Sequence, residues 1–206
     1  MDAQGLARAI GRISRKIEEN KDYLVKLDQQ NGDGDLGISM NDGFKAVCMI
    51  MELSEEKDLG KLLMKAGNAF NEAAPSSLGT ILSFGFMGMA RSLKGTMDAT
   101  PRQIADALHA GVDKIMEKAG SRPGERTILD SLYPAVETLG KKLEEENGDL
   151  YKALKEAARI AAVGAEATKQ MKPVHGRAAY YGEKNLGYLD GGAVVGRLIF
   201  EALCGD

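Results

Sequence analysis

Apolar residues recur along this 206-residue chain at the spacing of an α-helix. In the first segment they return every three, four or seven positions, which places them on one helical face; the set is Leu6, Ile10, Ile13, Ile17, Leu24 and Leu27. Alternating runs of Val, Ile, Thr and Tyr, the pattern typical of strands, do not exceed four or five residues. The sequence therefore predicts an all-α protein.

We expect about eight helices joined mostly by short connections, an arrangement that places consecutive helices antiparallel. Thr100-Pro101 is a typical helix start, and Pro134 is expected to bend or interrupt the helix that contains it. The expected helices cover residues 6–28, 40–53, 59–73, 77–93, 101–116, 127–146, 149–171 and 190–203. Together they predict a single domain over residues 1–206.

The composition is that of an ordinary globular protein, with 44% hydrophobic and 28% charged residues and a net charge of −3. The absence of a long basic run argues against nucleic-acid binding, and no apolar stretch reaches the roughly 18 residues of a membrane span. No signal peptide is evident at the N-terminus, so we expect a cytoplasmic protein. Cys48 and Cys204 are expected to be buried free thiols.

An acidic run follows the first expected helix. Asp28, Asp33 and Asp35 lie within eight residues, with glycines beside two of them. Carboxylate oxygens are the ligands that Mg²⁺ and Ca²⁺ prefer. Asn, Asp and Gly also dominate ordinary turns, so the run by itself leaves a turn and a cation site equally open.

A calcium-binding EF-hand does not fit this run. Counting from Gln29 puts Met40 where the motif needs a bidentate Glu, and counting from Asn31 puts Leu36 where it needs Gly. The chain also lacks GxxxxGK[ST], a strand-linked GxGxxG, HExxH and CxxC. If phosphates are bound, they must be held by aspartate-bound Mg²⁺, helix N-termini and arginines.

Three later segments fit that kind of phosphate site. Residues 76–80 start an apolar helix with hydroxyls and a glycine, residues 124–130 combine a loop arginine with a helix start, and residues 190–192 open the last helix with Asp-Gly-Gly. Two turn-rich basic loops, residues 120–126 and 172–189, are either functional or simply solvated. Each segment alone is weak evidence.

In their order along the chain, these segments resemble the nucleotide-binding L subunit of dihydroxyacetone kinase. Residues 27–44 match L-D-x-x-x-G-D-x-D-[HC]-G-x-[NT]-M-x-x-G-F, with departures at two positions. Residues 123–130 are similar to P-G-[DE]-[KR]-T-M-x-D, and residues 176–193 to G-R-A-x-Y-x-G-E-[RK]-x-x-G-x-x-D-P-G-A. Residues 76–80 stand at the Gly/Ser-rich helix start of the family. The resemblance covers nearly the whole chain.

The resemblance implies an up-and-down barrel of antiparallel helices that binds ADP or ATP and two Mg²⁺ ions at one end. It implies that Asp28, Asp33 and Asp35 are metal ligands, and that they and Arg177, which would reach the phosphates from a loop lid, are the catalytic residues. The implied nucleotide-binding residues are Gly37, Ser39, Ser77, Leu78, Gly79, Ile128, Arg177, Asp190, Gly191 and Gly192.

The implied activity is phosphoryl transfer to dihydroxyacetone held on a separate K subunit. In one branch of the family a phosphocarrier subunit of the phosphoenolpyruvate system rephosphorylates bound ADP, and in the other ATP exchanges. Leu36 stands where the family commonly has His, Ser39 replaces Asn and Gly191 replaces Pro. These departures leave open a non-catalytic nucleotide-sensing regulator, or a kinase for another short ketose.

Overall fold

A computed structural model describes residues 1–30, 32–145, 148–176, 179–180, 182 and 186–205. All regular secondary structure in these ranges is helical, as the sequence predicts. The elements are α1 (Ala3–Glu19), α2 (Lys21–Asp28), α3 (Leu36–Leu53), α4 (Leu59–Ala73), α5 (Ser77–Ser92), α6 (Pro101–Ala119), α7 (Leu129–Glu145), α8 (Leu150–Ala167), the short 3₁₀ helix η1 (Thr168–Gln170) and α9 (Gly191–Cys204).

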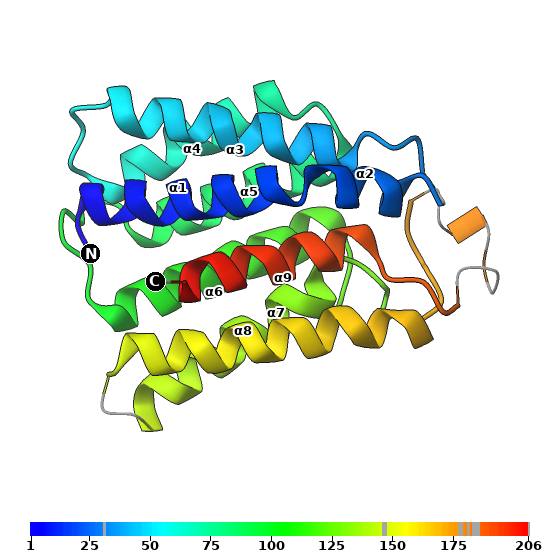
Figure 1. Cartoon of the computed structure of the whole chain (residues 1–206). Coiled ribbons are helices and arrows are strands. Elements are labelled where there is room, and N and C mark those ends of the chain that lie inside the picture. Colours follow the sequence, from blue (N-terminus) through cyan, green and yellow to red (C-terminus); the bar gives the residue numbers. More distant parts are fainter. Residues whose placement is uncertain (31, 146–147, 177–178, 181, 183–185, 206) are drawn as a thin grey trace.

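The long helices form a closed up-and-down ring (Figure 1). From α3 onward each helix packs against the next, α1 and α2 together form one rod against α3, and α9 returns to α1. Both chain termini lie at one end of the ring, and the segment that contains η1 lies at the other. The predicted fold of antiparallel helices is confirmed.

The interior of the ring is apolar. Large side chains such as Ile17, Phe44, Phe70, Leu139 and Phe200 are almost completely buried there. An apolar cavity remains among α1, α5, α6, α7 and α9, so the ring is a barrel with an incompletely filled centre. The two cysteines are free, as expected, although each is only partly buried.

The first expected helix is two helices in the structure. α1 ends at Glu19 and α2 begins at Lys21, so the prediction of one helix to Asp28 is corrected at Asn20. The Asn20 side chain donates to the carbonyl oxygen of Lys16 at 2.8 Å. Asparagine competes with the backbone for its hydrogen bonds in this way, which explains the break.

Other differences include the start of α3, the course of α7 and the end of α8, which lies at Ala167 and not at the expected Met171. α3 begins at Leu36, directly after the acidic run and ahead of the expected start at Met40. α7 continues through Pro134 without the expected interruption, with the Thr138 hydroxyl donating to the Pro134 carbonyl oxygen at 2.7 Å. α4 has the expected bounds.

Glycines let neighbouring helices touch backbone to backbone. A Cβ atom added to Gly60 of α4 would lie 2.6 Å from the Ala90 carbonyl oxygen of α5. One added to Gly88 of α5 would lie 2.4 Å from the Ala110 carbonyl oxygen of α6. These contacts leave no room for a side chain, so the spacing of α4, α5 and α6 depends on glycine.

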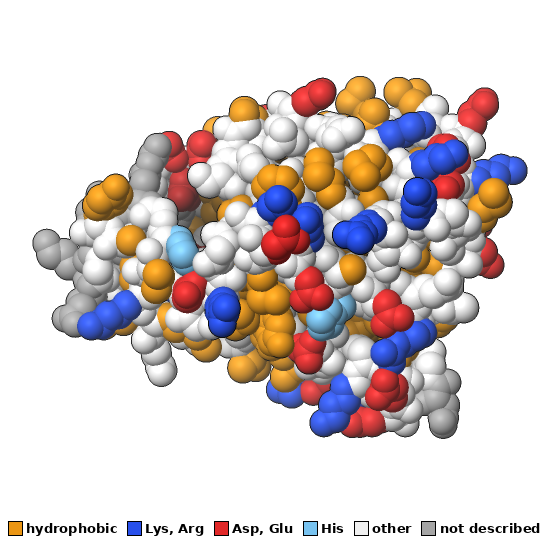
Figure 2. All heavy atoms as spheres, turned by 180° about the vertical axis from the view of Figure 1, so that it is seen from behind, with side chains coloured by type: hydrophobic (Ala, Val, Ile, Leu, Met, Phe, Trp, Pro, Cys, Tyr) orange, Lys and Arg blue, Asp and Glu red, His pale blue; other side chains and the backbone are white. Residues whose placement is uncertain are grey.

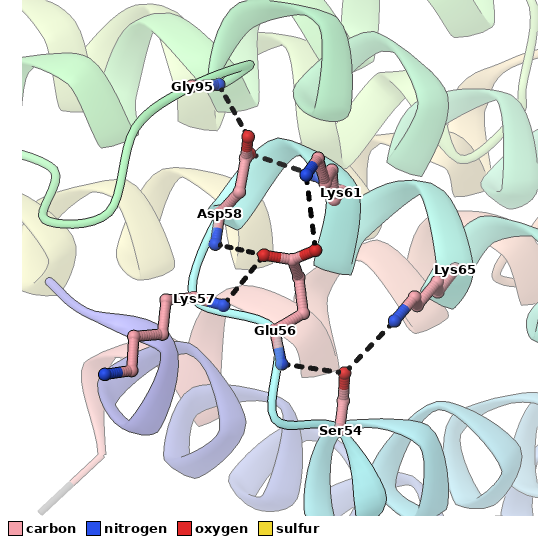
Figure 3. A network of polar contacts seen from close by, with 7 residues as sticks. All are labelled: Ser54, Glu56, Lys57, Asp58, Lys61, Lys65 and Gly95. Carbon is pink, nitrogen blue, oxygen red and sulfur yellow. Dashed lines mark hydrogen bonds and ion pairs between the residues drawn. The ribbon is translucent and has the colours of Figure 1, made fainter.

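Polar contacts join two connections at the end with the chain termini (Figure 3). The buried Asp58 caps α4 by accepting from the backbone N–H of Lys61 at 3.1 Å, and it accepts from Gly95 of the α5–α6 connection at 3.0 Å. Glu56 accepts in turn from the N–H groups of Lys57 and Asp58. Burial raises the pKa of Asp58, but the N–H donors outweigh burial and hold that pKa below its usual value.

Within the described part of the chain, no helix combines the length and apolar character needed to cross a membrane.

We predict that Gly88→Ala lowers the free energy of unfolding by about 1–3 kcal/mol, because the new methyl group meets the α6 backbone. Gly11→Ala in α1 is the matched control, since a Cβ there meets nothing within 4 Å. This control should be neutral or stabilising by up to about 1 kcal/mol. Urea unfolding of both variants measures the difference, and equal stabilities would contradict the packing argument.

Candidate functional site

Four helix N-termini meet at the end of the ring opposite the chain termini (Figure 1). Because successive helices alternate in direction, α3, α5, α7 and α9 all begin there. The hydroxyl oxygens of Ser39 in α3 and Ser76 before α5 lie 2.7 Å apart. A Cβ atom built on Gly192 of α9 would lie 3.2 Å from the backbone nitrogen of Ile128 before α7. Unpaired N–H groups and helix dipoles make such an end favourable for an anion.

The three aspartates of the acidic run converge at this same end. Asp28 is the last residue of α2, and Asp33 and Asp35 follow in the turn before α3. One carboxylate oxygen from each lies within 4.8 Å of the other two. The chemistry of this donor set fits a hard divalent cation such as Mg²⁺.

Glycines shape the turn around Asp28. The Asp28 carboxylate accepts from the N–H of Gly34 at 2.8 Å, and the φ of 79° at Gly34 favours glycine. A Cβ atom on Gly32 would lie 2.3 Å from an Asp28 oxygen. Figure 2 shows acidic side chains beside a hollow at this end of the molecule. The turn therefore wraps closely around one carboxylate while Asp33 and Asp35 stay exposed.

Gly37 and Gly79, expected to contact nucleotide, each lie against backbone. A Cβ atom on Gly37 would lie 2.2 Å from the Lys21 carbonyl oxygen, and one on Gly79 would lie 2.0 Å from that of Ala74. Close packing is sufficient reason for glycine at both positions. Their contact with nucleotide stays a prediction.

The start of α5 presents hydroxyl groups. The Ser76 Oγ caps the helix by accepting from the N–H of Gly79 at 3.1 Å. Ser77 is the first helical residue and is exposed, whereas the side chain of Leu78 packs partly into the core. The helix start thus leaves the Ser77 hydroxyl accessible to a ligand.

Asp190 organises the start of α9. Its carboxylate accepts from the N–H of Ala193 at 2.7 Å, and its own N–H donates to the Thr168 hydroxyl at 3.0 Å. Burial raises the pKa of Asp190 to about 6, against the lowering effects of the Ala193 N–H and the Arg126 guanidinium. This carboxyl group is therefore held in an environment that disfavours its charge.

Arg126 is a residue of this end that the sequence did not assign to the site. It is buried, and its Nη2 donates to the Tyr188 carbonyl oxygen at 3.0 Å. Burial lowers the pKa of Arg126, while the Asp190 carboxylate acts to raise it. The sequence signal for this residue is an arginine just before a helix start, in a segment that fits a phosphate site, although Arg126 itself is not among the predicted site residues.

The two long loops singled out in the sequence contact each other. The His175 ring and the Glu125 carboxylate lie 2.6 Å apart, and the Val174 N–H donates to the Glu125 carbonyl oxygen. The Gly187 N–H donates to the Lys169 carbonyl oxygen at 2.8 Å, which fastens the other side of the loop to η1. Arg177 lies outside the described residues, so its role stays a prediction.

The fold and this end define a class of protein: an all-α ring whose helix N-termini and carboxylate cluster suit a metal-bound anion. The chain belongs to the DAK2 domain family, which matches residues 30–205.

The chain is also similar in sequence to named kinases and kinase subunits. The ADP-binding subunit DhaL of the PEP-dependent dihydroxyacetone kinase of Escherichia coli is 30% identical over 84% of this chain and 81% of its own length. L-erythrulose 1-kinase of Mycolicibacterium smegmatis is 28% identical over 98% of this chain, but this chain spans only 35% of that protein.

A solved structure has the same fold. The dihydroxyacetone kinase from C. freundii, in complex with AMP-PNP and Mg²⁺, matches with a TM-score of 0.74 at 22% identity. The match covers 96% of this chain and 33% of that kinase. At this identity the likeness establishes the fold alone.

We predict that Asp190→Asn makes the stability less dependent on pH between about 4 and 6. The raised pKa means that the folded protein holds this proton more tightly than the unfolded chain, so ionisation of Asp190 destabilises the fold as pH rises through that window. Asparagine keeps the helix cap without the charge. At pH 8 the variant should be more stable than the wild type by up to about 2 kcal/mol. Urea unfolding from pH 4 to pH 8 measures this, and an unchanged slope would contradict it.

Proposed function

We propose that this chain is the phosphoryl-transfer subunit of a dihydroxyacetone-type kinase, which holds Mg-ADP or Mg-ATP and passes the phosphoryl group to a ketose on a separate K subunit. The observation that carries the proposal is the carboxylate cluster of Asp28, Asp33 and Asp35 at the end where four helices begin. Membership of the DAK2 domain family and the name of the E. coli relative support it.

In this proposal Asp28, Asp33 and Asp35 hold magnesium, with two ions expected from the family resemblance. Bound Mg²⁺ supplies charge neutralisation on the phosphate oxygens. The N–H groups at the start of α5 and the hydroxyls of Ser39 and Ser77 bind phosphate oxygens. Phosphoryl transfer needs mainly positioning and electrostatic stabilisation, and a ring of fixed helix ends provides both.

The remaining predicted contacts surround the rest of the nucleotide. Leu78, Ile128 and the turn at residues 190–192 border the base and ribose, and Arg177 reaches the phosphates. The whole of residues 1–206 acts as one nucleotide-binding domain, which we expect to be cytoplasmic and to bind neither nucleic acid nor membrane.

Two ketoses are candidates for the phosphoryl acceptor. Dihydroxyacetone is favoured by the name of the E. coli relative, whereas the M. smegmatis relative is named an L-erythrulose 1-kinase. A kinase for a slightly longer ketose is therefore the second candidate. A nucleotide-sensing regulator is the third, and the Leu36 and Gly191 departures motivate it.

We predict that Asp33→Asn and Asp35→Asn each abolish Mg²⁺-dependent ADP binding and phosphoryl transfer. The neutral amide removes one charge from the metal site while both residues stay exposed, so the helical fold should survive. Calorimetry with ADP, with and without Mg²⁺, measures binding, and circular dichroism checks the fold. Asp22→Asn, an exposed change on α2 outside the cluster, is the matched control. Normal transfer in the Asp33 and Asp35 variants would refute the proposal.

A second measurement identifies the phosphoryl donor. If a phosphocarrier subunit recharges bound ADP, we expect ADP to copurify with the chain in near-stoichiometric amounts. If ATP is the exchangeable donor, the purified chain should be largely free of nucleotide. Assays with a cognate K subunit, comparing dihydroxyacetone with erythrulose, then identify the ketose. Tight ADP binding without transfer to either ketose would favour the regulator.

A further inference from the structure

Arg126 is held in an unusual conformation in the loop before α7. The residue is 4% exposed, and its φ of 60° lies in the left-handed region that residues with a side chain rarely adopt. The Asp130 carboxylate fixes the loop by accepting from the N–H groups of Gly124 and Thr127 at 2.5 and 2.6 Å. Two strong hydrogen bonds thus maintain a strained backbone that keeps a cationic side chain buried.

The buried guanidinium group is only partly satisfied. Its Nη2 donates to the Tyr188 carbonyl oxygen, whereas Nε and Nη1 have no hydrogen-bond partner among the described residues. Leaving donors of a buried cation unpaired destabilises a fold. Backbone strain together with unpaired buried donors is the kind of local defect that clusters at ligand sites, where the ligand completes the contacts.

The position of Arg126 points to the nature of that ligand. It lies two residues before Ile128, which contacts Gly192 at the start of α9, and it interacts electrostatically with Asp190. The positive ends of α7 and α9 therefore meet beside the guanidinium group. A cation and two helix N-termini together favour an anionic ligand, and arginine suits phosphate oxygens in particular.

We propose that Arg126 binds the nucleotide at the phosphate next to the ribose, beside Ile128 and residues 190–192, with Nε and Nη1 donating to oxygens of that phosphate. The inference rests on the proposed function, since it requires a nucleotide at this end of the ring. It adds to the site a buried cation in the loop before α7. The alternative is a purely structural role, in which Arg126 only donates a hydrogen bond to the Tyr188 carbonyl oxygen.

Ligands with different numbers of phosphates separate these roles. Binding of adenosine, AMP and Mg-ADP to the full chain is measured by displacement of a fluorescent adenosine analogue. We expect Arg126→Gln to weaken Mg-ADP binding by about tenfold or more and to leave adenosine within about twofold of wild type. Arg126→Lys, which keeps the charge, should recover part of the loss. Arg122→Gln, an exposed change in the same loop, is the control and should alter none of the affinities.

An equal loss of affinity for all three ligands would overturn the inference, because that is the result of a purely structural role. Unchanged Mg-ADP binding in Arg126→Gln would overturn it as well. Circular dichroism and thermal melting check the fold. If Arg126→Gln does not fold, the ratio of Mg-ADP to adenosine affinity in Arg126→Lys decides in the same way. A wild-type chain that binds no Mg-ADP would instead overturn the proposed function, which distinguishes the two failures.

Discussion

Backbone contact between antiparallel helices is the constraint on which the rest of the structure depends. At Gly60, Gly88 and Gly164 a Cβ atom would lie between 2.0 and 2.6 Å from a carbonyl oxygen of the neighbouring helix. Short connections make successive helices antiparallel, and glycine lets these neighbours pack closely, so a closed ring of them brings every second N-terminus to the same end. The candidate site is therefore a consequence of topology before any functional side chain is considered.

Gly37 links this packing to the acidic cluster. It allows the start of α3 to lie against the Lys21 carbonyl group of α2, so the two helices are joined by a short turn instead of an open loop. That turn holds Asp33 and Asp35 beside Asp28. The carboxylates lie among positive helix ends, which stabilise negative charge. A divalent cation between the carboxylates and a phosphate would offset the repulsion between these negative groups, so that both could lie at this end of the ring.

Periodicity predicted the helices because each buries one apolar face, and α4 even has the expected bounds. The break between α1 and α2 was less predictable, because it depends on the Asn20 side chain donating a hydrogen bond to the Lys16 carbonyl oxygen. The aspartates could be singled out as candidates because carboxylates are the ligands that Mg²⁺ prefers, and the structure brings the three together. The burial of Arg126 could not be predicted, because an arginine in a turn-rich loop is usually exposed and only tertiary packing buries it. The packing roles of Gly37 and Gly79 could not be predicted either, because they depend on tertiary contacts with the backbone of Lys21 and Ala74.

The departures at Leu36 and Gly191 are neighbours in space. A Cβ atom on Gly191 would lie 2.5 Å from the Leu36 Cδ2 atom, so the leucine side chain fills the space that a larger residue at 191 would need. The two changes are best understood as one exchange of packing between the starts of α3 and α9. They are therefore not two independent losses from a catalytic site. The exchange leaves Asp28, Asp33 and Asp35 together. The two departures therefore favour a regulator less than they would as separate losses, and the kinase stays the preferred function.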